Sequence, residues 1–212
     1  MDVSKYWRNR GKGYYDELEN ETASVKSLLK TQEKHVVELL QGKKFNSILE
    51  VGCGFGRYTK ILYSLFKPEK YLAIDISKEQ IENAKKYVNN EKIEFQCIKI
   101  QDFNSDQKFD LVFASEILMH INFEDIEEVI KKLNMFCKGS IVTIDLFEKD
   151  KIGSSSKGYC FMHDYAKLFE KNGIKKVNIH PIPIPLKMKT ISAYAKLRGR
   201  HGIDKQAIIE VH

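Results

Sequence analysis

The chain has 212 residues, of which 42% are hydrophobic, and it carries a formal net charge of +6. This length and apolar content suffice for one domain with a real core. Apolar runs are broken by charged residues well before the 18 residues of a membrane-spanning helix, and residues 1–5 lack the apolar core of a signal peptide, so we expect no membrane segment. Because the lysines are spread along the chain, the charge indicates ordinary solvated surfaces more than a polyanion partner.

The four cysteines, Cys53, Cys97, Cys137 and Cys160, are far apart and form no Cys-x-x-Cys pair. This spacing argues against a zinc site and against a disulfide framework. A reducing cytoplasm is the compartment that fits it best.

The N-terminal segment 6–15 holds the only tryptophan, Trp7, among tyrosines and cations. It can form a lid that excludes water from a ligand, stack on bases, or simply pack on the sheet. Residues 22–41 follow with apolar side chains at helical spacing and end before Gly42, which predicts a helix packed on a sheet.

Strands and helices then alternate. The predicted strands are 47–51, 71–75, 93–98, 109–114 and 140–147, and the predicted helices between them are 57–66, 78–89 and 123–136. Such alternation predicts a mainly parallel sheet with right-handed crossovers.

A different pattern closes the chain. Residues 163–172 read as a helix closed by Gly173, followed by strands at 175–182 and 190–196. About seven residues separate these two strands, too few for a parallel crossover, so we expect an antiparallel β-hairpin at the sheet edge. The alternating prolines of 181–185 cannot continue as a central strand.

The most informative segment is Glu50-Val-Gly-Cys-Gly-Phe-Gly56, which lies between a predicted strand and a predicted helix. Glycines there allow a sharp turn and let a ligand approach the backbone at a helix N-terminus. Asp75 ends the next strand about 20 residues later, where a carboxylate can accept both ribose hydroxyls. A nucleoside is therefore indicated, although the G-x-G-x-G spacing differs from the G-x-G-x-x-G of dinucleotide sites and no Walker lysine follows.

These features resemble the class I S-adenosylmethionine-dependent methyltransferases, as does the segment Phe109-Asp-Leu-Val-Phe-Ala-Ser-Glu-Ile-Leu-Met-His-Ile121, which is similar to the fourth strand of their small-molecule, type 11/12-like branch. The resemblance covers about residues 47–196. It implies a Rossmann-like α/β three-layer sandwich, whose mainly parallel seven-stranded sheet ends in an antiparallel C-terminal β-hairpin. We expect a single domain over residues 1–212, with a helical cap or lid at 1–44, the core at 45–198 and a tail at 199–212.

The resemblance also implies which residues hold S-adenosylmethionine. They are Glu50 at the methionine ammonium, Gly52, Gly54 and Gly56 along the methionine and ribose, Asp75 at the ribose, Ile76 against adenine, Ile100 and Gln101 at the adenine edge, and Ser115 beside the sulfonium. The family's common Gly-Asp-Ala is replaced here by Ile100-Gln101-Asp102, so Asp102 is an alternative to Gln101 for the adenine amine.

Two histidines are candidate catalytic bases because imidazole titrates near neutral pH. His120 follows the fourth strand near the expected methyl position, and His163 lies after the fifth. Each can equally line the pocket or cap a helix. The acidic-plus-amide ligand set of magnesium-dependent relatives is missing around Glu116 and Asp145, so no metal is expected.

The sequence thus predicts a methyltransferase that acts on an oxygen or nitrogen of a small-molecule acceptor, as a monomer or homodimer. A nucleic-acid methyltransferase is the first alternative, because residues 187–201 form a basic stretch. A nicotinamide-dependent reductase and a non-catalytic protein that binds S-adenosylmethionine are further alternatives.

Overall fold

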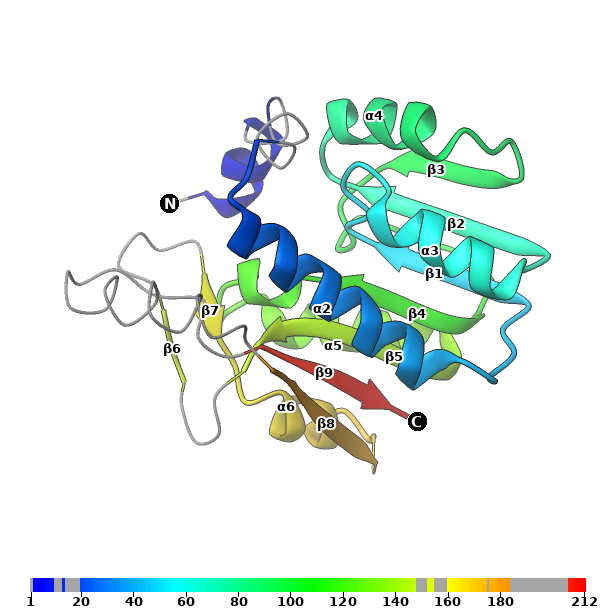
Figure 1. Ribbon diagram of the computed structural model, residues 1–212. Coiled ribbons are helices and arrows are strands. Elements are labelled where there is room, and N and C mark those ends of the chain that lie inside the picture. Colours follow the sequence, from blue (N-terminus) through cyan, green and yellow to red (C-terminus); the bar gives the residue numbers. More distant parts are fainter. Residues whose placement is uncertain are drawn as a thin grey trace.

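The computed structural model describes residues 2–9, 13, 20–147, 152–154, 160–174, 176–183 and 206–212. Its centre is a seven-stranded sheet in the order β3-β2-β1-β4-β5-β9-β8 (Figure 1). The strands are β1 (Ser47–Val51), β2 (Lys70–Asp75), β3 (Ile93–Cys97), β4 (Phe109–Ser115), β5 (Cys137–Leu146), β8 (Val177–Ile182) and β9 (Gln206–Val211). The first five are parallel, whereas β9 runs antiparallel to both β5 and β8.

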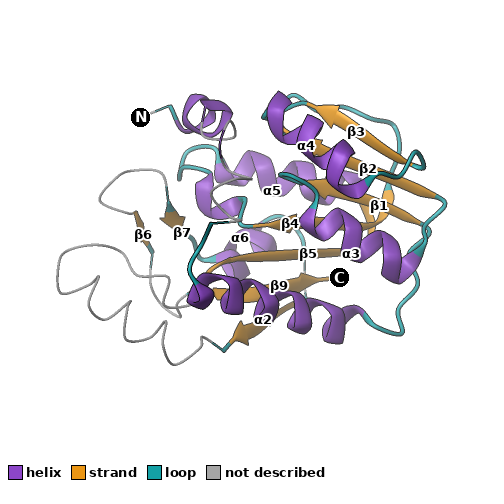
Figure 2. Cartoon of the chain, turned by 45° about the horizontal axis from the view of Figure 1, so that its top comes forward, coloured by secondary structure: helices purple, strands orange, loops and turns teal. Residues whose placement is uncertain are grey.

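Helices cover both faces of this sheet. One face carries α2 (Ala23–Leu40), α3 (Arg57–Phe66) and α4 (Lys78–Val88), and the other carries α5 (Ile126–Phe136) and α6 (Tyr165–Lys171) (Figures 1 and 2). A short 3-10 turn, η1 (Leu118–His120), follows β4, and β6 (Gly153–Ser154) pairs with β7 (Phe161–Met162) outside the main sheet. Residues 3–9 are helical. The predicted three-layer α/β architecture is confirmed.

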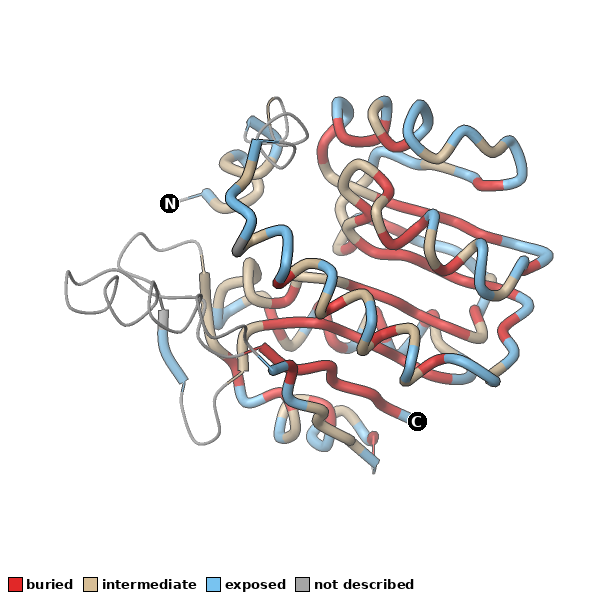
Figure 3. Tube along the Cα trace, in the orientation of Figure 1, coloured by how far each residue is buried: buried red, intermediate tan, exposed pale blue. Residues whose placement is uncertain are grey.

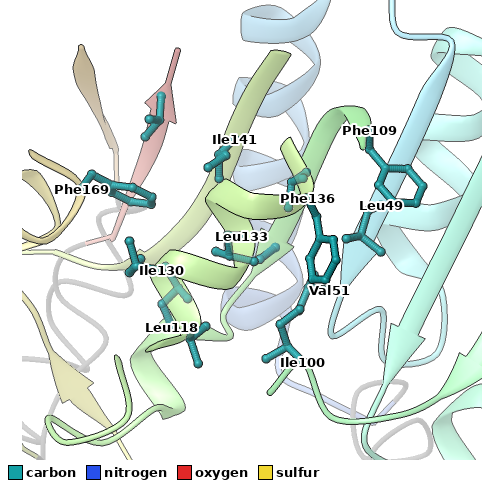
Figure 4. Packing of buried hydrophobic residues seen from close by; sticks show 14 of the residues in the cluster. Leu49, Val51, Ile100, Phe109, Leu118, Ile130, Leu133, Phe136, Ile141 and Phe169 are labelled. Atoms are coloured by element: carbon teal, nitrogen blue, oxygen red, sulfur yellow. The ribbon is translucent and has the colours of Figure 1, made fainter. Parts of the chain in front are cut away.

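Two apolar clusters, one on each side of the sheet, hold the layers together. Leu133 and Phe136 of α5 pack with Leu49 and Val51 of β1 on one side (Figure 4), and on the other side Leu40 of α2 belongs to the second cluster. β1 is buried along its whole length and β4 and β5 over most of theirs, whereas the helices are buried on one side only (Figure 3). Strands buried on both faces require near-continuous apolar runs, which is why the sequence pattern predicted them well.

The prediction that the chain ends in an antiparallel pair of strands is confirmed, but the residues predicted for the second strand are wrong. The strand that pairs with β8 is Gln206–Val211, in the part expected to be a tail, whereas residues 190–196 lie outside the described residues, as does the basic stretch 187–201. Because β9 lies between β5 and β8 it is buried on both faces, and the apolar run Ala207-Ile208-Ile209 meets that requirement. Pro181 is accommodated in β8 because β8 is the edge strand.

No helix in the described ranges combines the length and the apolar character needed to cross a bilayer.

Candidate active site

A cavity of about 350 Å³ lies at the carboxyl ends of the parallel strands. The segments that follow β1, β2, β3 and β4 line it, together with Leu29 of α2 and with Val3, Ser4 and Trp7 from the N-terminal helical segment. Open α/β sheets bind ligands at this edge, near the point where the strand order reverses. Here the reversal falls between β1 and β4, and the glycine loop follows β1.

The glycine loop turns by means of three left-handed residues, with φ values of +71° at Gly52, +54° at Gly54 and +94° at Gly56. The backbone N–H groups of Gly52 and Cys53 both donate to Ile74 O, at 2.7 and 3.0 Å, and so tie the loop to the end of β2. Residues with a Cβ rarely adopt these φ values, so the turn requires glycine.

The three glycines differ in what surrounds them. A Cβ at Gly52 would lie 2.0 Å from Ile117 Cδ1, and a Cβ at Gly56 would lie 2.6 Å from Val88 Cγ2, whereas a Cβ at Gly54 would meet no atom within 4 Å. Gly52 and Gly54 line the cavity and Gly56 does not. Gly54 is therefore the position where a ligand can approach bare backbone, and Gly56 serves the packing of α3 against α4.

Asp75 lies where the ribose prediction requires it, at the cavity edge after β2. Its Oδ2 accepts a hydrogen bond from Gly54 N at 2.9 Å, and its Oδ1 accepts one from Ser77 N at 2.8 Å. Burial raises the pKa of Asp75, and these two N–H donors oppose that rise. Each carboxylate oxygen retains a further lone pair for a hydroxyl donor.

Glu50 is 3% exposed and also lines the cavity. Its Oε2 accepts hydrogen bonds from Thr59 Oγ1 at 2.6 Å and from Tyr71 OH at 2.7 Å. Burial raises the pKa of Glu50 to about 7, against the lowering effect of the two hydroxyl donors. A carboxyl group in this state becomes an anion readily when a cation lies beside it.

The predicted adenine contacts divide into two groups. Ile76, Ile100 and Gln101 line the cavity, and Gln101 Oε1 is shielded from solvent with no donor among the described residues. Asp102 does not line this cavity and instead lines a neighbouring surface pocket with Arg8 and Lys78. The geometry thus favours Gln101 over Asp102 for contact with an amine inside the cavity.

Ser115, the last residue of β4, and Glu116, which follows it, also line the cavity. The Ser115 Oγ is buried without a hydrogen bond among the described residues and lines the cavity, so it can serve a ligand there. From the sequence, Glu116 was weighed only as a possible metal ligand. No nearby residues mark it as a site residue, because its hydrogen-bond partners lie far away in the chain.

The two candidate histidines have different surroundings. His120 lines the cavity, its ring centroid lies 4.2 Å from that of Trp7, and its Nδ1 is 3.7 Å from Cys160 Sγ. His163 is 3% exposed, does not line the cavity, and donates from Nε2 to Ile121 O at 2.9 Å. Burial lowers the pKa of His163. His163 precedes α6, which Asp164 caps, so its side chain packs under the loop that carries His120.

Arg57 is a cavity residue that the sequence analysis did not single out. It is the first residue of α3, and its guanidinium joins α3 to α2 by donating to Glu33 Oε1 and Gln32 Oε1, each at 3.1 Å. Its position directly after the third glycine of the loop could have marked it in the sequence as a candidate cavity residue. Its partners come from a helix that begins more than 30 residues earlier in the chain.

Comparison with known proteins identifies the family. Residues 48–139 match the methyltransferase domain family. The malonyl-[acyl-carrier protein] O-methyltransferase of Acetivibrio thermocellus is 35% identical over 94 residues, which are 44% of this chain and 32% of that protein. The putative methyltransferase 235L of Invertebrate iridescent virus 6 is 32% identical over 81 residues, which are 38% of this chain and 30% of that protein. Residues 48–139 therefore belong to the methyltransferase domain family, and they are similar to S-adenosylmethionine-dependent methyltransferases of class I.

Solved structures agree on the fold. Magnesium protoporphyrin IX methyltransferase from Synechocystis PCC 6803, solved with S-adenosylmethionine bound, superposes with a TM-score of 0.72 at 14% identity, covering 100% of this chain and 97% of that one. The [4+2]-cyclase SpnF superposes with a TM-score of 0.65 at 14% identity, covering 85% and 80%. Because a cyclase shares it, the fold alone does not fix the reaction. The chain also spans only about a third of the length of the curated relatives that it matches.

The cavity fits S-adenosylmethionine, the cofactor of the family that residues 48–139 match. Gly54 leaves the backbone open, Asp75 offers carboxylate oxygens to the ribose, and Glu50 offers a carboxylate to the ammonium. The unpaired Gln101 Oε1 can accept a hydrogen bond from the adenine amine. The family and cofactor predicted from the sequence are confirmed, while the roles of these residues remain predictions.

Proposed function

We propose that the protein transfers a methyl group from S-adenosylmethionine to an oxygen or nitrogen atom of a small molecule. The observation that carries the proposal is that a single cavity joins the cofactor-binding residues to a second group of side chains. This second group, the acceptor end of the cavity, consists of Trp7, Leu29, Glu116, Met119 and His120.

When bound, S-adenosylmethionine supplies an electrophilic methyl group on its sulfonium. The chain's own part is mainly to bind and orient two reactants so that the acceptor atom approaches the methyl carbon in line, because such positioning can supply much of the acceleration. Glu50, Asp75 and Gln101 would fix the cofactor by its two ends, and Ser115 would lie between them and the acceptor end.

His120 is the proposed base that removes the acceptor proton. Among the histidines in the described part of the chain, His120 is the one that lines the cavity, and the Trp7 ring packs against its imidazole. Trp7 also supports the lid interpretation of the N-terminal segment, since with Val3 and Ser4 it lines the cavity. A covered cavity keeps water away from the reacting atoms.

The relatives suggest two kinds of acceptor atom, oxygen and nitrogen. Malonyl-[acyl-carrier protein] O-methyltransferases favour an oxygen atom, and a phosphoethanolamine N-methyltransferase of Arabidopsis thaliana, 24% identical over 139 residues, favours nitrogen. We therefore propose a small acceptor of either kind.

Two measurements test this function. Calorimetric titration should show binding of S-adenosylmethionine and S-adenosylhomocysteine with one site per chain. Transfer of a radiolabelled methyl group should then be screened over small amines, alcohols, carboxylic acids and RNA. Transfer to small molecules but not to RNA supports the proposal, whereas salt-sensitive transfer to RNA alone would replace it with the nucleic-acid alternative. Absence of cofactor binding would overturn it.

A further inference from the structure

Glu116 has an unusual backbone conformation at a prominent place in the site. It directly follows β4 and has φ +58°, a left-handed value that a residue with a side chain adopts at a cost. Its N–H donates to Ile144 O at 2.6 Å, which ties this turn to the end of β5. Strained residues of this type cluster at functional sites because the surrounding structure must enforce them.

Two buried glutamines hold the Glu116 carboxylate in one orientation. Its Oε1 accepts hydrogen bonds from Gln32 Nε2 at 3.1 Å and from Gln206 Nε2 at 2.8 Å, and the two glutamines are joined to each other at 2.6 Å. Gln32 Oε1 in turn accepts from Arg57. Side chains from α2, the β4 loop and β9 thus combine to position one carboxylate, at the cost of burying two amides.

The second oxygen of this carboxylate is available to a ligand. Glu116 Oε2 makes no hydrogen bond to any described residue, although Glu116 lines the cavity. The neighbouring cation, Arg57, already forms an ion pair with Glu33 at 3.1 Å. Lys99 also lines the cavity, but it follows β3, three strands from β4, at roughly 14 Å from Glu116 by the spacing of strands in a sheet.

Arg57 attracts the Glu116 carboxylate electrostatically, although the ion pair that it forms is with Glu33. Asp145 is fully buried, burial raises the pKa of Asp145 well above its usual range, and its Oδ1 accepts a hydrogen bond from Met119 N at 2.9 Å. The hydroxyl of Tyr58 and the thiol of Cys160 likewise have raised pKa values, mainly because of burial. The acceptor end of the cavity therefore presents an oriented carboxylate, partly balanced by Arg57, with one acceptor oxygen that no described residue engages.

We propose that Glu116 determines acceptor specificity by binding a hydrogen-bond donor, a protonated amine or a hydroxyl group, that lies next to the atom to be methylated. This inference rests on the proposed methyl transfer and narrows its substrate class. An acceptor that presents a free carboxylate at this point would meet like charge, so the chain selects against the acid group carried by the malonyl substrate named for its relatives.

Glu116→Gln is the informative variant. The amide oxygen of glutamine can still accept from Gln32 and Gln206, so the network and the fold are retained while the charge is removed. Glu128→Gln is the matched control, because Glu128 is exposed on α5, on the opposite face of the sheet.

The experiment compares hexylamine, hexanol and hexanoate, which share an apolar tail, by ligand-observed NMR on protein saturated with S-adenosylhomocysteine. In the wild-type protein and in Glu128→Gln, hexylamine and hexanol should bind at least about 10-fold more tightly than hexanoate. In Glu116→Gln the preference should fall to about 3-fold or less, with affinity for S-adenosylhomocysteine unchanged within a factor of about 3.

Each other outcome has a definite meaning. An unchanged preference in Glu116→Gln, or no binding of any probe to the wild-type protein, overturns the inference and leaves the proposed function standing. Loss of S-adenosylhomocysteine binding in Glu116→Gln alone also overturns it, because Glu116 would then hold the cofactor. Failure of the wild-type protein to bind S-adenosylhomocysteine would overturn the proposed function as well.

Discussion

Glu50→Gln should make the cofactor-free protein more stable, and by an amount that depends on pH. The Glu50 carboxyl has an ordinary pKa of 4.5 in the unfolded chain, and burial raises it to about 7 in the folded chain. The folded state therefore binds a proton more tightly than the unfolded state. The stabilisation that this proton gives is fully present below pH 4.5 and is lost as the pH rises through about 7.

The size of the effect follows from the same two values. A rise from 4.5 to about 7 corresponds to about 3 kcal/mol of lost stability once the group is ionised in both states. Glutamine has nearly the same shape, never ionises, and can accept the hydrogen bonds from Thr59 and Tyr71 through its amide oxygen. The gain in unfolding free energy from Glu50→Gln should thus grow from near zero at pH 4.5 to about 3 kcal/mol at pH 8.

Urea denaturation of both proteins at pH 5, 6, 7 and 8, without cofactor, measures this difference. The exposed Glu128→Gln variant serves as the control and should give a difference that does not vary with pH. S-adenosylhomocysteine should bind Glu50→Gln at least about 10-fold more weakly, because its ammonium group loses a charged partner. A stability difference that is flat between pH 5 and pH 8 would refute the assignment of Glu50 as a buried carboxyl with a raised pKa.

Four further substitutions separate binding, packing and catalysis. Gly54→Val should lower S-adenosylmethionine affinity at least about 10-fold, because its side chain enters open cavity, and unchanged affinity in calorimetry would contradict the site. Gly56→Ala should instead lower the unfolding free energy by about 1–3 kcal/mol, since φ is +94° and its Cβ would contact Val88; a stable variant that fails to bind cofactor would contradict this division. Asp75→Ala should weaken cofactor binding by about 1.5–3 kcal/mol in the same titration, and a loss well below this range would argue against a charged hydrogen bond to the ribose. His120→Ala should reduce kcat about 100-fold or more with cofactor affinity retained, and equal turnover would remove His120 as the base.

The sequence by itself determined the fold class, and it located the residues proposed for the cofactor end of the site. Buried parallel strands need continuous apolar runs, and a tight strand-to-helix turn needs glycine, so both leave local patterns that can be read without a structure. Gly54 and Asp75 lie on adjoining crossovers and were found for that reason. Asp75 accepts a hydrogen bond from Gly54 N across only 21 residues of chain.

The tertiary structure alone decided the acceptor end. The carboxylate of Glu116 is oriented by Gln32 and Gln206, which lie 84 and 90 residues away in the chain, and no short motif records such a contact. It also decided that His163 packs beneath the loop while His120 faces the cavity, and that the last strand is 206–211. Side-chain direction and strand pairing depend on which distant segments share a face, and local periodicity carries no information about that choice.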